Sequence, residues 1–250
     1  MTSSISMFEG IFSSSTKPVW IDGQSVEVVR TNRKKTASIK IEDGKIQVFI
    51  PKRYPDKKLQ ELIDNKTPWI REKLRIQSEV PPTKPKEYAS GESFTYLGRN
   101  YRLKLTQDLT FEVKLRGGQL VLGVDKNLPD NRREDFIRDQ LVRWYQEHAE
   151  QRLKDKTSRY SKALGVKPKS VTLKDYKSRW GSCSIHGDIS YNWKIIIAPH
   201  RIIDYVVVHE LCHMHQHNHS SAFWKLVERV FSDYKESRQW LKVNGGSLVV

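Results

Sequence analysis

The chain has 250 residues, 37% of them hydrophobic and 10% aromatic, which excludes a disordered protein and allows one large domain or two small ones. Lysine and arginine number 44 against 29 acidic residues, a formal charge of +15. This excess is compatible with a partner such as DNA or another nucleic acid, although scattered charge is more often a solvated surface. We find no apolar run of membrane-spanning length, no secretory signal at the start, and only two cysteines, Cys183 and Cys212. We therefore expect a cytoplasmic protein with no membrane partner.

Residues 1–80 are expected to form an N-terminal unit. Apolar and polar residues alternate from residue 25 to 50, and Asp43-Gly44 is typical of a hairpin turn, so this segment predicts a small antiparallel β meander. Residues 56–76 carry apolar side chains near helical spacing, but Pro68 should break or kink such a helix. The pattern predicts a pair of helices after the meander.

Residues 81–128 are expected to form a connector and a second β segment. Three prolines in VPPTKPK, residues 80–86, indicate an extended linker. Alternating stretches resume after residue 92 and turn at Gly117-Gly118, which predicts another antiparallel group. The sequence indicates no function for this segment.

Residues 129–250 contain the longest helical pattern and the most distinctive motif. A helix is predicted from an N-cap at Asp130 to a stop at Gly165. Strands are predicted at 170–176 and 189–197, with a turn at SRWGSCS, residues 178–184, and a further helix from about His200. All three segments could still pack as one unit.

The predicted helix from His200 carries the pattern H-E-x-x-H at His209, Glu210 and His213. Residues four apart lie on one helix face about 5 to 6 Å apart, so two imidazoles there can bind one Zn²⁺. Glu210 lies about 100° round the helix and is placed to act as a general base on a water molecule. Chance matches to this short pattern are common. Here the preceding residues 202–208 are mostly apolar, and burying the three polar side chains without a metal would be unfavourable.

Three histidines could supply a third ligand: His215, His217 and His219. On a continuing helix His215 faces the wrong side, and the Cα atom of His217 lies about 12 Å from that of His209. His219 fits if the helix ends near His217 and the chain turns back, with Asn218 in the left-handed conformation and Ser220 capping a new helix. We therefore predict His209, His213 and His219 as ligands.

Several stretches together resemble the YgjP-like family, also called DUF45, which is described as predicted zinc metallopeptidases or metal-dependent hydrolases akin to the WLM and SprT-like proteases. They are residues 33–55, 178–184, 189–199 and 203–224. The resemblance implies an α+β fold with a zincin-like catalytic domain, an active-site helix against a mixed sheet, and the same ligands and base. Gln216 stands where the related metzincin pattern H-E-x-x-H-x-x-G-x-x-H has glycine, so we expect the turn to be made at Asn218.

The predicted activity is zinc-dependent hydrolysis of peptide bonds in a protein or peptide substrate. Arg179, Tyr191 and His186 precede the site helix and are candidate oxyanion or substrate contacts. The strand at 189–197 could pair with an extended substrate. Two alternatives stay open: a basic, nucleic-acid-associated protein with a structural or vestigial zinc, and a zinc hydrolase of a non-peptide amide.

Overall fold

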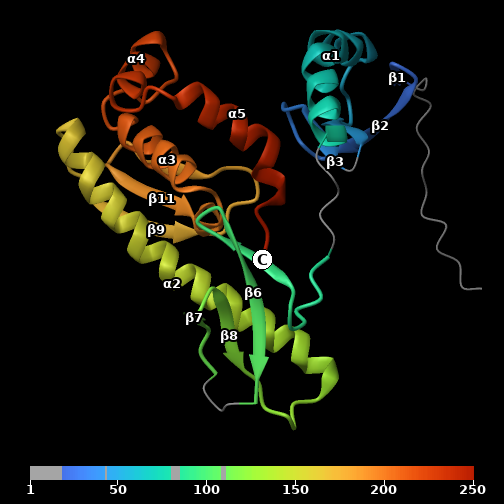
Figure 1. Ribbon diagram of the computed structural model, residues 1–250. Coiled ribbons are helices and arrows are strands. Elements are labelled where there is room, and N and C mark those ends of the chain that lie inside the picture. The colour runs from blue at the N-terminus through green and yellow to red at the C-terminus, as the bar shows by residue number, and fades with distance from the viewer. Residues whose placement is uncertain (1–18, 43, 80–84, 108–110) are drawn as a thin grey trace, which may run out of the picture. The chain divides into compact units, whose positions relative to one another are not determined.

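The structure is a computed structural model that describes residues 19–42, 44–79, 85–107 and 111–250 (Figure 1). The chain divides into two compact units, an N-terminal unit of residues 1–82 and a C-terminal unit of residues 83–250. Helices and sheets occur in both, so the chain is of the α+β class. The division predicted at 128/129 falls inside the C-terminal unit, because a single hydrophobic cluster runs from Tyr88 to Leu248. Most of the predicted linker, residues 80–84, lies outside the described residues.

The N-terminal unit is a four-stranded sheet followed by one helix. Its elements are β1 (Val19–Ile21), β2 (Gln24–Thr31), β3 (Ser38–Glu42), β4 (Lys45–Pro51) and α1 (Asp56–Glu79). β3 and β4, the strands on either side of the turn predicted at Asp43-Gly44, are antiparallel as expected, and Asp43 itself lies outside the described residues. The rest of the predicted antiparallel meander is wrong. β2 does not pair with β3 but pairs in parallel with β4, and the strand order is β1-β2-β4-β3. Alternation fixes which face of a strand is buried, and it leaves the strand order open.

The predicted helix pair at residues 56–76 is also wrong, because α1 continues through Pro68. Proline lacks the N–H that would bond the carbonyl four residues earlier. The loss is outweighed by burial: Leu59, Ile63 and Ile70 lie on one side of α1 and pack into the same cluster as the sheet. The hydroxyl of Thr67 donates to the carbonyl of Ile63 (2.9 Å) in the turn before the proline.

The C-terminal unit begins with a sheet of the same topology. Its strands are β5 (Ser93–Tyr96), β6 (Arg99–Thr106), β7 (Lys114–Arg116) and β8 (Gln119–Gly123), in the order β5-β6-β8-β7. β6 and β8 are parallel, so the antiparallel group predicted here is again corrected. The first hairpin of each sheet turns on two left-handed residues, Asp22-Gly23 (φ 49° and 80°) and Leu97-Gly98 (φ 52° and 76°). The arrangement of four strands and a following helix therefore occurs twice in the chain.

The helix after the second sheet is α2 (Asp130–Leu164), which ends as predicted at a left-handed Gly165 (φ 67°). Its N-cap is Pro129 rather than Asp130. A third, mixed sheet follows, with β9 (Ser170–Lys174), β10 (Gly181–Cys183) and β11 (Asp188–Asn192) in the order β10-β11-β9. The turn predicted at 178–184 is thus partly an edge strand. The strand predicted to reach 197 stops at Asn192, whose side chain caps a 3₁₀ helix, η1 (Trp193–Ile197).

Three helices complete the unit: α3 (His200–Cys212), α4 (Ser221–Val230) and α5 (Tyr234–Asn244), with a short 3₁₀ turn, η2 (Gly245–Ser247). α3 packs against α2, α4 and α5, which leaves most of its side chains buried (Figure 1). The β5–β6 turn binds η1, which precedes α3, because the N–H groups of Leu97 and Gly98 donate to the carbonyls of Ile196 and Ile197 (2.9 and 3.0 Å). None of the helices in the described ranges combines the length and apolarity of a membrane span.

Candidate metal centre

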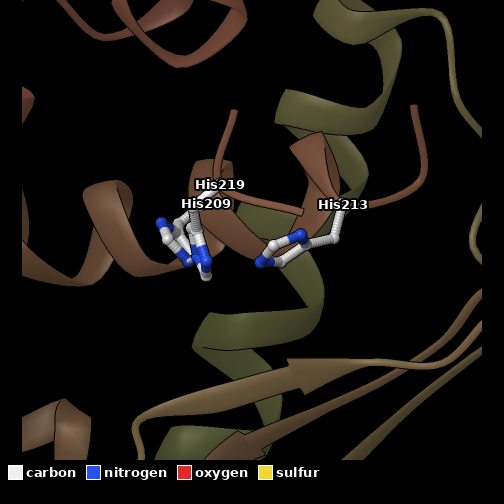
Figure 2. A group of neighbouring side chains, drawn as sticks. All are labelled: His209, His213 and His219. Carbon is white, nitrogen blue, oxygen red and sulfur yellow. Dashed lines mark hydrogen bonds between the residues drawn. The ribbon is translucent and has the colours of Figure 1, made fainter. Parts of the chain in front are cut away.

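The three histidines of the predicted ligand set lie together (Figure 2). His209 lies in the last turn of α3, and His213 follows at its C-cap with right-handed backbone angles, so the four-residue spacing still places both on one face. His219 comes from the segment before α4. Ring centroids are 5.0 Å apart for His209 and His213, 5.0 Å for His209 and His219, and 4.8 Å for His213 and His219.

The chain returns to the site differently from the prediction. α3 ends at Cys212 rather than near His217, and Asn218 is not among the described residues with a left-handed backbone. Asn218 instead accepts a hydrogen bond from the N–H of Ser220 through its side-chain oxygen (3.2 Å). The hydroxyl of Ser220 accepts from the N–H of Phe223 (3.4 Å), so the predicted N-cap of the next helix is present.

The orientation of the imidazoles suits a shared metal ion. The Nε2 atoms of His209 and His219 lie 3.0 Å apart, close to the roughly 3.3 Å that separates two nitrogens on one tetrahedral zinc. The Nδ1–H of His213 donates to the main-chain carbonyl of Gln216 (3.0 Å), which leaves its Nε2 lone pair free to bind. One nitrogen from each ring lies within 4.8 Å of the others. The donor set therefore fits a divalent ion that accepts nitrogen ligands.

Burial keeps these imidazoles neutral, which is the form that binds a metal. Burial, and to a smaller extent the neighbouring histidines, lower the pKa of His209 to about 3. Burial also lowers the pKa of His213 and of His219. Phe223 stacks on His213 with ring centroids 4.6 Å apart and forms part of this apolar wall. The Nδ1 atom of His209 is buried without a hydrogen-bond partner among the described residues.

Glu210 is buried beside these ligands, and Gly181 makes room for it. A Cβ atom on Gly181 would lie 2.6 Å from both Cγ and Oε1 of Glu210. Gly181 lies on β10, the edge strand of the third sheet. Burial raises the pKa of Glu210 to about 8, and the charge of Arg179 opposes that rise.

These residues line a pocket of about 630 Å³ bounded by β10, α3 and α5. Of the three predicted oxyanion or substrate contacts, only Arg179 lines it. Tyr191 is corrected: its side chain is fully buried and its hydroxyl shares a hydrogen bond with Thr157 (3.0 Å). His186 is corrected too, because it lies exposed in the turn between β10 and β11, outside the pocket lining.

The pocket also contains residues that sequence reasoning missed. Gly181 had a usable signal, since a glycine inside a strand often marks a close approach by another group. Arg238 and Lys242 line the pocket from α5, and their sequence context is that of an ordinary charged helix face. Of the two histidines rejected as ligands, His217 lines the pocket, and His215 lies outside it, donating from Nε2 to the carbonyl of Leu164 (3.1 Å).

Known proteins were compared with the chain by family and by structure. The family model described as YgjP-like, metallopeptidase domain, matches residues 35–244. Among solved structures, the chain is similar to the metallopeptidase zymogen abylysin of Pyrococcus abyssi, with 26% identity over 36% of this chain and 94% of that chain and a TM-score of 0.33. No curated protein matches. Because the family model covers more than half of the sequence, the chain belongs to the YgjP-like metallopeptidase family.

Proposed function

We propose that this protein is a zinc-dependent peptidase of the H-E-x-x-H type, with His209, His213 and His219 as the metal ligands and Glu210 as the general base. The observation that carries the proposal is the placement of three neutral imidazoles, with nitrogens within 4.8 Å, in one pocket with a buried carboxylate. Family membership supports a metal-dependent peptidase in general, and the ion and the roles of the residues rest on this geometry.

The donor set favours zinc in a catalytic site over zinc in a structural one. Structural zinc sites commonly have four protein ligands and use cysteine, whereas three histidines leave a coordination position open. When bound, the ion supplies a Lewis acid that polarises the scissile carbonyl, acidifies the attacking water and favours the ionised form of Glu210.

Glu210 is placed to transfer a proton from the attacking water to the leaving amine. It follows His209 in sequence, so its carboxylate lies beside the ligand set rather than in it, and it faces the same pocket. It accepts the proton of the attacking water and returns it to the leaving amine. Arg179 lines the same pocket and is the remaining predicted donor to the oxyanion.

The edge strand β10 supports a peptide as the substrate. The strand predicted to pair with substrate, β11, lies between β10 and β9 and has no free edge. β10 has one, and Gly181, Ser182 and Cys183 all line the pocket. An extended peptide that pairs with β10 would be held by its backbone and brought past Glu210.

Two predictions from the sequence stay as proposals. A non-peptide amide would be cleaved by the same residues, so a set of amide substrates belongs in the assay. A nucleic-acid partner rests on the charge of +15 alone, and its effect is tested by adding DNA at low salt.

The test combines metal analysis with proteolysis. Zinc content and casein digestion, with and without DNA, are measured on the wild type, Glu210→Gln, His219→Ala and the exposed control His186→Ala. We expect one zinc per chain in the wild type, zinc retained in Glu210→Gln with activity reduced by about 10²-fold or more, and weakened zinc binding in His219→Ala only. A wild type that binds no zinc when it is supplied, or an active Glu210→Gln variant, would refute the proposal.

A further inference from the structure

The pocket contains more cationic side chains than the proposed hydrolysis requires. Its lining contains three permanent cations, Arg179, Arg238 and Lys242, and a single acid, Glu210. No Asp or Glu carboxylate within the described ranges lies within 4.0 Å of any of the three cations, although Lys156 and Lys194 elsewhere in the unit pair with Asp204 and Asp175. The positive charges of the pocket are therefore not neutralised by a neighbouring carboxylate of the described residues.

Arg238 and Lys242 form a distinct pair. They are four residues apart on α5, so they share one face of that helix, and both reach the pocket. Like charges four residues apart repel each other and slightly lower the stability of a helix. An anion bound between them would remove this repulsion. Arg179 precedes β10 in the chain, and its charge acts on Glu210.

The guanidinium of Arg238 is held in place. It lies over the ring of Trp224, 4.8 Å from the ring centroid, and Trp224 in turn stacks on His219 with centroids 5.6 Å apart. A planar cation fixed on an aromatic face loses little further freedom when it binds a carboxylate through two parallel hydrogen bonds. Arg238 therefore offers a fixed guanidinium for a carboxylate, and only the ring of Trp224 separates it from His219, a proposed metal ligand.

We propose that Arg238 and Lys242 form a subsite for a carboxylate of the substrate, so that the enzyme selects peptides that present a carboxylate near the scissile bond. The inference rests on the proposed peptidase function and adds its substrate class. The carboxylate belongs either to an aspartate or glutamate side chain near the scissile bond or to the C-terminus of the peptide, and the same two cations suit both.

The test uses peptides that differ at one position. Glutamate, glutamine and lysine are placed in turn at each position around a cleaved bond, and each peptide is made with a free and with an amidated C-terminus. For the wild type with zinc, we expect kcat/KM to fall by about tenfold or more when the bound carboxylate is removed, either by replacing glutamate with glutamine at one position or by amidating the C-terminus. A preference that follows the side chain identifies an acidic residue, and one lost on amidation identifies the terminus.

Variants then locate the preference. Arg238→Gln and Lys242→Gln should each reduce the glutamate-to-glutamine ratio several-fold, and Arg238→Glu should favour the lysine peptide. Lys235→Gln is the matched control, because Lys235 is an exposed cation on the same helix outside the pocket lining, and its ratio should equal that of the wild type.

The outcomes separate this inference from the proposed function. With an active enzyme, cleavage rates that are equal for glutamate and glutamine peptides and are also unchanged by amidation of the C-terminus overturn the subsite and leave the peptidase intact. If no peptide is cleaved, the peptidase function fails, and binding of the same peptides to the zinc-loaded protein by calorimetry decides the subsite. Affinities that differ neither between glutamate and glutamine peptides nor between free and amidated C-termini, or a preference unaffected by Arg238→Gln, also overturn it.

Discussion

Replacing Gly181 by alanine tests whether β10 determines the position of the general base. The backbone of Gly181 is not left-handed, so alanine fits the strand itself. Its Cβ atom, however, would lie 2.6 Å from Cγ and Oε1 of Glu210 and 2.8 Å from Cδ. Ordinary contacts begin at 3.4 Å, so the carboxylate and the strand must separate by about 0.8 Å.

A displacement of that size affects catalysis more than folding. A misplacement of about 1 Å in a catalytic group can reduce the rate by about 10²-fold, so we expect Gly181→Ala to lower kcat on the order of 10- to 100-fold. Zinc content should stay at the wild-type level, because the clash involves the base and none of the three histidines. The assay is peptide hydrolysis at saturating substrate, with zinc measured on the same samples.

Two comparisons make the result specific. Gly246→Ala adds the same methyl group where a Cβ atom meets nothing within 4 Å, and its activity should match the wild type. In a Glu210→Gln background, adding Gly181→Ala should lower the residual rate less than twofold, because the displaced base is already absent. Wild-type activity in Gly181→Ala, or an equal loss in the Gln background, would refute the reasoning.

Three further changes probe the scaffold and the ligands. Gly98→Ala combines a left-handed backbone with a Cβ atom 2.8 Å from a proline main-chain atom, so the free energy of unfolding measured in urea should fall by about 2–4 kcal/mol. Gly118→Ala has an equally left-handed backbone but no obstructing atom, so its free energy of unfolding should fall by only about 1 kcal/mol. Ser220→Ala removes the N-cap of α4 beside the third histidine, so it should lower the free energy of unfolding by about 1 kcal/mol and weaken zinc binding in chelator competition. An unchanged zinc affinity would show that the cap does not position that histidine. In the metal-free protein the pKa of His209 falls from 6.5 to about 3 on folding, so the unfolded chain takes up the proton first and stability declines as pH falls from about 6.5 toward 3. Thermal melts of His209→Gln should show a shallower decline, and an identical pH profile would contradict the assigned burial.

The features that sequence predicted well are those with a local physical signature. The helix of residues 130–164 combines an apolar stripe, irregular in its second half, with a glycine stop, and both its length and its left-handed C-cap are confirmed. The grouping of His209, His213 and His219 followed from helix spacing and from the distance that excludes His217 on a straight helix. These inferences need only the geometry of neighbouring residues.

The features that sequence missed depend on contacts between distant segments. Alternating apolar residues predicted strands, but nothing local distinguishes the parallel β2–β4 and β6–β8 pairs from antiparallel ones. Tyr191 precedes the site helix in the sequence. Side chains alternate along β11, however, so Tyr191 faces the core, where its hydroxyl shares a hydrogen bond with Thr157 of α2. Arg238 reaches the pocket only because α5 packs on α3, a contact that no spacing in the sequence indicates.

The end of the site helix shows how the expected turn was avoided. A left-handed residue was expected because Gln216 replaces the glycine of the metzincin pattern. The structure reverses the chain with right-handed turns instead: after α3 ends at Cys212, the N–H groups of His215 and Gln216 both donate to the carbonyl of Cys212 (3.1 and 3.0 Å). This winding brings the carbonyl of Gln216 to Nδ1 of His213. The same main-chain turn thus orients one imidazole and sends the chain back toward His219, so no glycine is required.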